Sequence, residues 1–119
     1  SGEEVSGVID FYFACTDFLA YDLAVALNSW CFPERRWNRV SATAMIEGYE
    51  SVRPLLRKER AALPRLMRGA GLRFLLTRLY DWLNQDPNAL VTVKDPLEYR
   101  DLLLFLRDAD VESLYAPPA

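Results

Sequence analysis

The chain has 119 residues, of which 51% are apolar and 26% are charged, and its formal net charge is −3. The high apolar content excludes a disordered polypeptide. Charges interrupt every apolar run before it reaches about 20 residues, which excludes a membrane-spanning segment. The chain contains no histidine, so these residues alone cannot form a Ser-His or Cys-His catalytic pair or a His-ligated zinc site.

The first seventeen residues predict a strand followed by a loop. Val8 and Ile9 form the centre of the strand, which ends near Phe11. A single strand cannot form a sheet, so the strand that pairs with it must lie outside the chain, in the weak β pattern of residues 91–93, or in a second copy of the molecule. Asp10 closes the strand, where a buried carboxylate is costly unless a cation or hydrogen-bond donors meet it. Asp10 is therefore a candidate Mg²⁺ ligand, and the alternative is an ordinary turn-forming acid.

An apolar helix is predicted from Phe18 to Cys31, where leucines and alanines recur at helical spacing and Asp17 can cap the N-terminus. Because it is apolar around most of its circumference, we expect other helices to pack around it. Asp22 lies in its first turn. This carboxylate can accept backbone N–H groups either as a simple cap or from a neighbouring loop that it holds in place.

A second helix is predicted from Asn38 or Ser41 to about Val52, where Arg53-Pro54 forces an extended residue and a break.

The longest predicted helix begins near Lys58 and reaches Asn84. Pro64 either kinks it or occupies the first position of a new helix. A turn at residues 86–88 and a last helix from residue 98 to about residue 107 follow. We expect one domain over residues 1–119, with a helical bundle at 18–108 and a tail at 109–119.

Charge is unevenly distributed along the chain. Residues 51–80 carry a net charge of +7, whereas residues 1–50 and 81–119 each carry −5. A basic middle can attract phosphates or nucleic acid, but in a compact fold it pairs more simply with its own acidic flanks. No aromatic-basic motif supports nucleic-acid binding.

Two arginines of the long helix, Arg73 and Arg78, are candidate ligands of a substrate carboxylate, since arginine binds carboxylates in bidentate geometry. The alternative is an ion pair with Asp22, Asp81 or the C-terminal acids. The tryptophans fall at helical spacing and are interpreted as core or groove wall: Trp30, Trp37 and Trp82. Both cysteines, Cys15 and Cys31, lie in apolar surroundings that favour buried, reduced thiols.

Several segments carry a family resemblance. Gly7-Val8-Ile9-Asp10-Phe11-Tyr12-Phe13-Ala14, followed by Tyr21-Asp22-Leu23-Ala24-Val25 and Trp30-Cys31-Phe32, is similar to the homoserine kinase branch of the aminoglycoside phosphotransferase/choline kinase-like family. The resemblance continues through Arg53-Pro54-Leu55 and Leu72-Arg73-Phe74-Leu75 and covers about residues 6–107. It implies the mostly α-helical C-terminal lobe of a protein kinase-like fold, with a short N-terminal strand or hairpin remnant. It also implies transfer of the ATP γ-phosphate to the hydroxyl of L-homoserine, with Mg²⁺, in threonine biosynthesis.

Two site residues carry over by position in this resemblance. Asp10 matches the metal-binding acid, and Asp22 matches the helix acid that steadies the catalytic loop. The family's phosphate-covering loop, nucleotide lysine and His-x-Asp loop, which holds the catalytic base, have no counterpart here. The chain is therefore expected to be the C-terminal part of a cytoplasmic kinase, inactive by itself. Separated from the rest, it would expose apolar surface and self-associate.

Two alternatives stay open from the sequence. The first is a kinase of another small alcohol, such as choline or an aminoglycoside. The second is a non-catalytic helical interaction domain. We expect small-molecule substrates, with neither nucleic acid nor a membrane as partner.

Overall fold

The computed structural model describes residues 19–85 and 94–116, and all regular structure within these ranges is helical. The elements in chain order are an N-terminal helix at residues 19–30, the short 3-10 helix η1 (Pro33–Arg35), α2 (Arg39–Val52), α3 (Arg57–Leu83), α4 (Leu97–Leu106) and α5 (Val111–Leu114). The predicted mostly α fold is confirmed. The predicted strand with Asp10, the weak β pattern at 91–93, Cys15 and the turn at residues 86–88 lie outside the described residues.

The N-terminal helix occupies the centre of the bundle, as its apolar circumference predicted. Leu23, Ala24, Leu27 and the free Cys31 are all buried. The buried Asn28 amide donates a 3.0 Å hydrogen bond to the carbonyl of Met67 and so links this helix to α3. Buried side chains of every other helix except η1 complete the core: Ala42, Ile46, Leu63, Met67, Leu102, Leu106 and Leu114.

Local signals set both ends of α2. The side chain of Asn38 accepts a hydrogen bond of 3.0 Å from the Ser41 amide, which satisfies a backbone donor of the first turn. At the other end Arg53 is extended because Pro54 follows it. Both predicted boundaries of this helix are confirmed.

The long helix α3 is continuous through Pro64, which lies inside it and is buried. Its start is set instead by Glu59, whose carboxylate accepts a 2.8 Å hydrogen bond from the Leu56 amide. The same carboxylate lies 2.8 Å from the Arg53 guanidinium. Pro64 therefore does not begin a separate helix.

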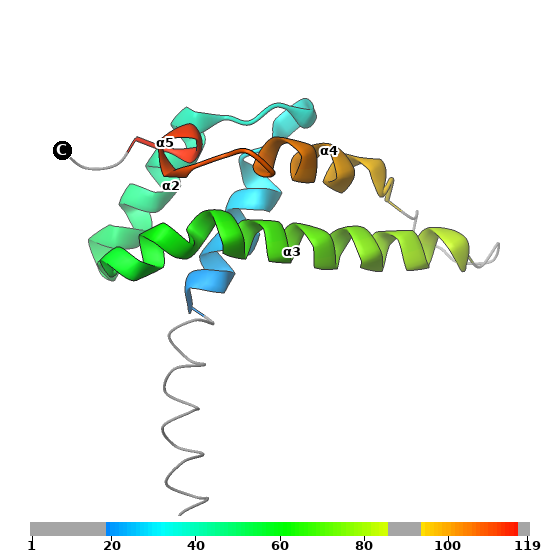
Figure 1. Ribbon diagram of the computed structural model, residues 1–119, viewed down its shortest axis with the longest axis horizontal. Coiled ribbons are helices and arrows are strands. Elements are labelled where there is room, and N and C mark those ends of the chain that lie inside the picture. Colours follow the sequence, from blue (N-terminus) through cyan, green and yellow to red (C-terminus); the bar gives the residue numbers. More distant parts are fainter. Residues whose placement is uncertain (1–18, 86–93, 117–119) are drawn as a thin grey trace, which may run out of the picture.

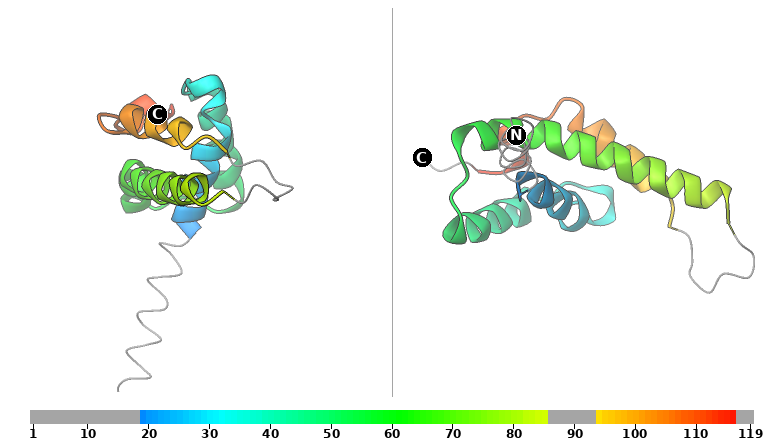
Figure 2. Two further views of the ribbon diagram at one scale, coloured as in Figure 1. Left: turned by 90° about the vertical axis from the view of Figure 1, so that its right-hand side faces the viewer. Right: turned by 90° about the horizontal axis from the view of Figure 1, so that it is seen from below.

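Helix α3 forms the base of the structure (Figure 1). Helix α4 lies along it, whereas α2 and α5 lie at its N-terminal end. Seen from below, the C-terminal half of α3 extends beyond the N-terminal helix and α2 (Figure 2). A glycine allows the close approach to α4, because a Cβ added at Gly71 would lie 3.1 Å from Cδ2 of Leu103.

The structure differs from the tail that the sequence predicted at residues 109–119. Asp110 caps the short helix α5 by accepting a 2.9 Å hydrogen bond from the Ser113 amide. Leu114 and Tyr115 follow, and each is 1% exposed. Trp37 Nε1 donates to the Leu114 carbonyl at 2.9 Å, which fixes this segment on the bundle. No local pattern predicts this docking, because Trp37 and Leu114 are 77 residues apart in the sequence.

No helix among the described residues is both long and apolar enough to cross a membrane.

Candidate functional site

Three of the four residues that the sequence singled out are described by the structure, and Arg78 lines a cleft whose lining includes neither Asp22 nor Arg73. Asp10 lies outside the described residues. Asp22 is exposed on the N-terminal helix, and its carboxylate forms no hydrogen bond or ion pair with another described residue. Its proposed role in holding a loop therefore stays a prediction.

Arg73 is an exposed residue that connects two helices. Its Nη1 donates a 2.9 Å hydrogen bond to the Tyr21 hydroxyl, and its guanidinium carbon lies 5.5 Å from the Phe74 ring centre. Tyr21 precedes Asp22, so Arg73 packs beside the helix turn that carries this acid. These contacts give Arg73 a role in positioning the N-terminal helix against α3.

Arg78, in contrast, lies at a cleft, where it contacts an aromatic ring and an acid. Its guanidinium carbon lies 4.4 Å from the Tyr99 ring centre, and the Tyr99 ring stacks on Phe74 with centroids 5.5 Å apart. Its Nη1 donates to the Glu98 carboxylate at 3.2 Å and more weakly to the Asp95 carbonyl at 3.5 Å. The ion pair with a C-terminal acid, which the sequence left open as the alternative role, is therefore present.

Six residues line this Arg78 cleft, which has a volume of about 510 Å³: Ser29, Trp30, Arg78, Lys94, Glu98 and Tyr99. The N-terminal helix supplies the first two, α3 supplies Arg78, and residues 94–99 supply the rest. Sequence analysis found Arg78 but missed Ser29, Lys94 and Glu98. No local pattern marks these three residues, because they converge only when α4 and the N-terminal helix both pack against α3.

The Arg78 cleft has a surplus of one positive charge, with two cationic side chains against the carboxylate of Glu98. Both hydrogen bonds of the Arg78 guanidinium use Nη1, and neither Nε nor Nη2 donates to another described residue. A guanidinium with two adjacent donors available can bind a carboxylate or a phosphate bidentately. The aromatic ring and Glu98 hold it in one orientation, which lowers the entropic cost of binding.

The three tryptophans have different environments. Trp30 is 75% exposed at the Arg78 cleft, so it is groove wall. Trp37 stacks on Phe105 at a centroid distance of 5.5 Å and belongs to the core. Trp82 is 46% exposed on α3.

A metal site is not formed by the described residues, which contain no group of three acids or cysteines placed to hold an ion. The Mg²⁺ prediction rests on Asp10, outside these residues.

Comparisons with known proteins agree with the resemblance seen in the sequence. The family model described as the phosphotransferase enzyme family matches residues 1–55. The chain is 62% identical over 109 residues to a homoserine kinase of Xanthobacter autotrophicus. The aligned region covers 91% of this chain and 34% of that protein.

Two further curated relatives carry the same name. A homoserine kinase of Methylobacterium nodulans is 62% identical over 107 residues, covering 89% of this chain and 33% of that protein. A homoserine kinase of Gluconobacter oxydans is 65% identical over 97 residues, covering 81% of this chain and 31% of that protein. The chain thus spans about a third of the length of the curated relatives it matches.

Proposed function

We propose that the chain is the C-terminal part of a homoserine kinase, which transfers the γ-phosphate of ATP to the hydroxyl of L-homoserine in threonine biosynthesis. The observation that carries this proposal is the 62% identity to a homoserine kinase over 91% of the chain. The Arg78 cleft supports it, because L-homoserine carries a carboxylate that a positively charged, arginine-lined cleft can bind.

In this proposal Arg78 binds the substrate carboxylate through Nε and Nη2. Lys94 adds a second positive charge at the cleft, and Trp30 forms an apolar wall for the methylene groups of the substrate. The surplus of positive charge also disfavours a cationic acceptor such as choline or an aminoglycoside. Among the kinases that the sequence left open, the cleft therefore favours one that acts on an amino-acid alcohol.

Asp10 is the proposed Mg²⁺ ligand, and Asp22 the proposed support of the catalytic loop. A magnesium ion bound with ATP would neutralise charge on the transferring phosphate. The catalytic base and the nucleotide lysine have no counterpart in these residues, so the 119-residue chain by itself should have no kinase activity. A cytoplasmic location follows from the same proposal.

The test uses the full-length protein with ATP and Mg²⁺ and compares L-homoserine, choline and kanamycin as acceptors. We expect phosphorylation of L-homoserine, and Asp10→Asn should lower kcat at least about 100-fold, because metal-bound charge stabilisation contributes several kcal/mol. Absence of L-homoserine turnover would reject the proposed function.

A second set of variants tests the cleft separately. Arg78→Gln should raise KM for L-homoserine by roughly 10- to 100-fold, the usual cost of one charge-assisted contact, with a smaller effect on kcat. The matched control is Arg65→Gln, an exposed arginine of the same helix. If Arg78→Gln leaves KM unchanged in an active kinase, the carboxylate contact lies elsewhere, and Arg73→Gln is the next variant to measure.

The alternative of a helical interaction domain is favoured by one surface. Four leucines spaced by four, three and four residues lie on α3 and are each at least 40% exposed: Leu72, Leu76, Leu79 and Leu83. This spacing is that of a helix-pairing seam. We propose that the separate 119-residue chain self-associates through it, and light scattering that detects a monomer at high concentration would reject this.

A further inference from the structure

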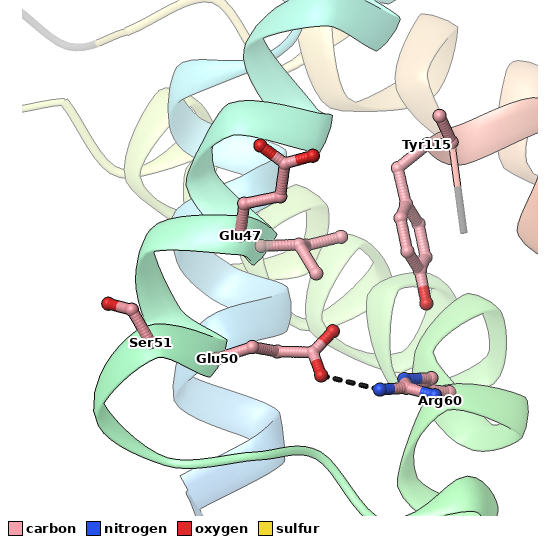
Figure 3. Close-up of a pocket in the computed structure, with 7 residues that line it drawn as sticks. Glu47, Glu50, Ser51, Arg60 and Tyr115 are labelled. Carbon is pink, nitrogen blue, oxygen red and sulfur yellow. Dashed lines mark hydrogen bonds and ion pairs between the residues drawn. The ribbon is translucent and has the colours of Figure 1, made fainter. Parts of the chain in front are cut away.

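A second pocket lies between α2 and the docked C-terminal segment, and it shares no residue with the Arg78 cleft. Its volume is about 490 Å³, and it is lined by Ile46, Glu47, Glu50, Ser51, Arg60, Tyr115 and Ala116. We call it the Tyr115 pocket. Figure 3 shows Glu47 and Glu50 on one side of it, the Tyr115 hydroxyl directed toward Arg60, and the ion pair of Arg60 with Glu50.

Two buried hydrogen-bonding atoms of this pocket lack partners among the described residues, namely the Tyr115 hydroxyl and Arg60 Nε. Tyr115 is 1% exposed. Burial raises the pKa of its hydroxyl, so this group stays protonated near neutral pH and can donate. A buried donor without an acceptor is costly. The two donors therefore favour a ligand that brings an oxygen acceptor.

The charge of the pocket narrows the class of ligand. Glu47 and Glu50 outnumber Arg60, so the pocket carries a surplus of one negative charge. A phosphate or another multivalent anion would be repelled by the two glutamates. A simple amine would leave both buried donors without an acceptor. A small zwitterion satisfies both requirements, because its carboxylate accepts hydrogen bonds while its ammonium pairs with an acid.

We infer that the Tyr115 pocket binds a free α-amino acid at a site separate from the Arg78 cleft. The carboxylate accepts from the Tyr115 hydroxyl and from Arg60 Nε, and the ammonium group pairs with Glu47. The Arg60 side chain is 31% exposed, so a rotation of this long side chain can turn Nε toward the ligand. The Glu50 ion pair keeps the guanidinium at the pocket during this movement.

The test is calorimetric titration of the full-length protein with L-alanine, which has no hydroxyl to be phosphorylated. Propionate and n-propylamine serve as probes that carry one charge each. We expect L-alanine to bind at least 10-fold more tightly than either. Glu47→Gln and Tyr115→Phe should each weaken L-alanine binding at least 10-fold, whereas Glu112→Gln, at another exposed glutamate, should leave it unchanged.

Two results would overturn this inference. One is failure of L-alanine to bind, or binding no tighter than that of propionate or n-propylamine. The other is binding that Arg78→Gln abolishes but Glu47→Gln does not, which would place the amino acid in the Arg78 cleft and leave the proposed kinase function intact. Glu47 is exposed, so its variant decides the outcome even if Tyr115→Phe fails to fold.

Discussion

Tyr99 lies beneath Arg78, with the guanidinium carbon 4.4 Å from the ring centre. The ring is 5% exposed and stacks in turn on Phe74. This stack connects α3 to α4 and fixes the direction of the Arg78 side chain at its cleft. Stability of the bundle and orientation of the proposed substrate ligand therefore depend on the same aromatic ring.

Replacing Tyr99 by leucine should destabilise the protein and weaken substrate binding together. Loss of the ring removes both the stacking and the cation–π contact, at a cost of about 1–3 kcal/mol. In the full-length enzyme, KM for L-homoserine should rise more than kcat falls. Tyr99→Phe keeps the ring and should preserve both properties, and a lowered Tm with unchanged KM in Tyr99→Leu would show that Arg78 needs no such support.

Glu59 should make the stability of the protein sensitive to acid. Its side chain is 5% exposed. Burial acts to raise its pKa, but the Leu56 amide and the Arg53 guanidinium outweigh this and hold the pKa below its ordinary value. Because the folded pKa is depressed, the stabilisation is fully present above the ordinary pKa of about 4.3 and is lost as pH falls through the folded pKa.

The variant Glu59→Gln measures this contribution. At pH 7 it should lower the free energy of unfolding by about 1–3 kcal/mol, since the neutral amide loses the ion pair with Arg53 at a buried position. The difference from wild type should shrink as urea unfolding is repeated below about pH 4. A difference that is constant with pH would mean that the carboxylate charge is not the cause.

Trp37 should control whether the C-terminal segment stays docked. Trp37→Phe removes the indole donor to the Leu114 carbonyl while keeping an aromatic ring against Phe105. We expect a loss of about 1 kcal/mol and faster amide hydrogen exchange at Tyr115, whose amide donates to the Val111 carbonyl. Trp82→Phe is the control at an exposed position, and equal exchange rates in the two variants would contradict the prediction.

Two glycines of α3 offer a matched pair. An added Cβ at Gly69 meets nothing within 4 Å, whereas one at Gly71 lies 3.1 Å from the Leu103 side chain. Gly69→Ala should therefore raise the free energy of unfolding by about 0.5–1 kcal/mol, the helix preference of alanine over glycine. Gly71→Ala should gain less, because Leu103 must move. Urea unfolding of both variants tests this, and a larger gain at Gly71 would contradict the packing described here.

Local sequence determined much of the fold. Asn38 caps α2 and Arg53-Pro54 ends it, so both boundaries follow from residues within a few positions of each other. The apolar circumference of residues 18–31 likewise predicted a central helix, because such a surface has no solvent-facing side. The family resemblance could also be recognised from the sequence, because it depends only on the order of residues.

Tertiary packing decided the rest, because it brings together residues that no local pattern connects. Pro64 is tolerated inside α3, where the sequence left a kink or a new helix as options. The residues after 109 dock through Trp37, and this contact places Tyr115 opposite Arg60. The Arg78 cleft forms only where α4 lies along α3. Hydrogen bonds, ring stacking and ion pairs act over a few ångströms in space, so their partners are set by the path of the chain.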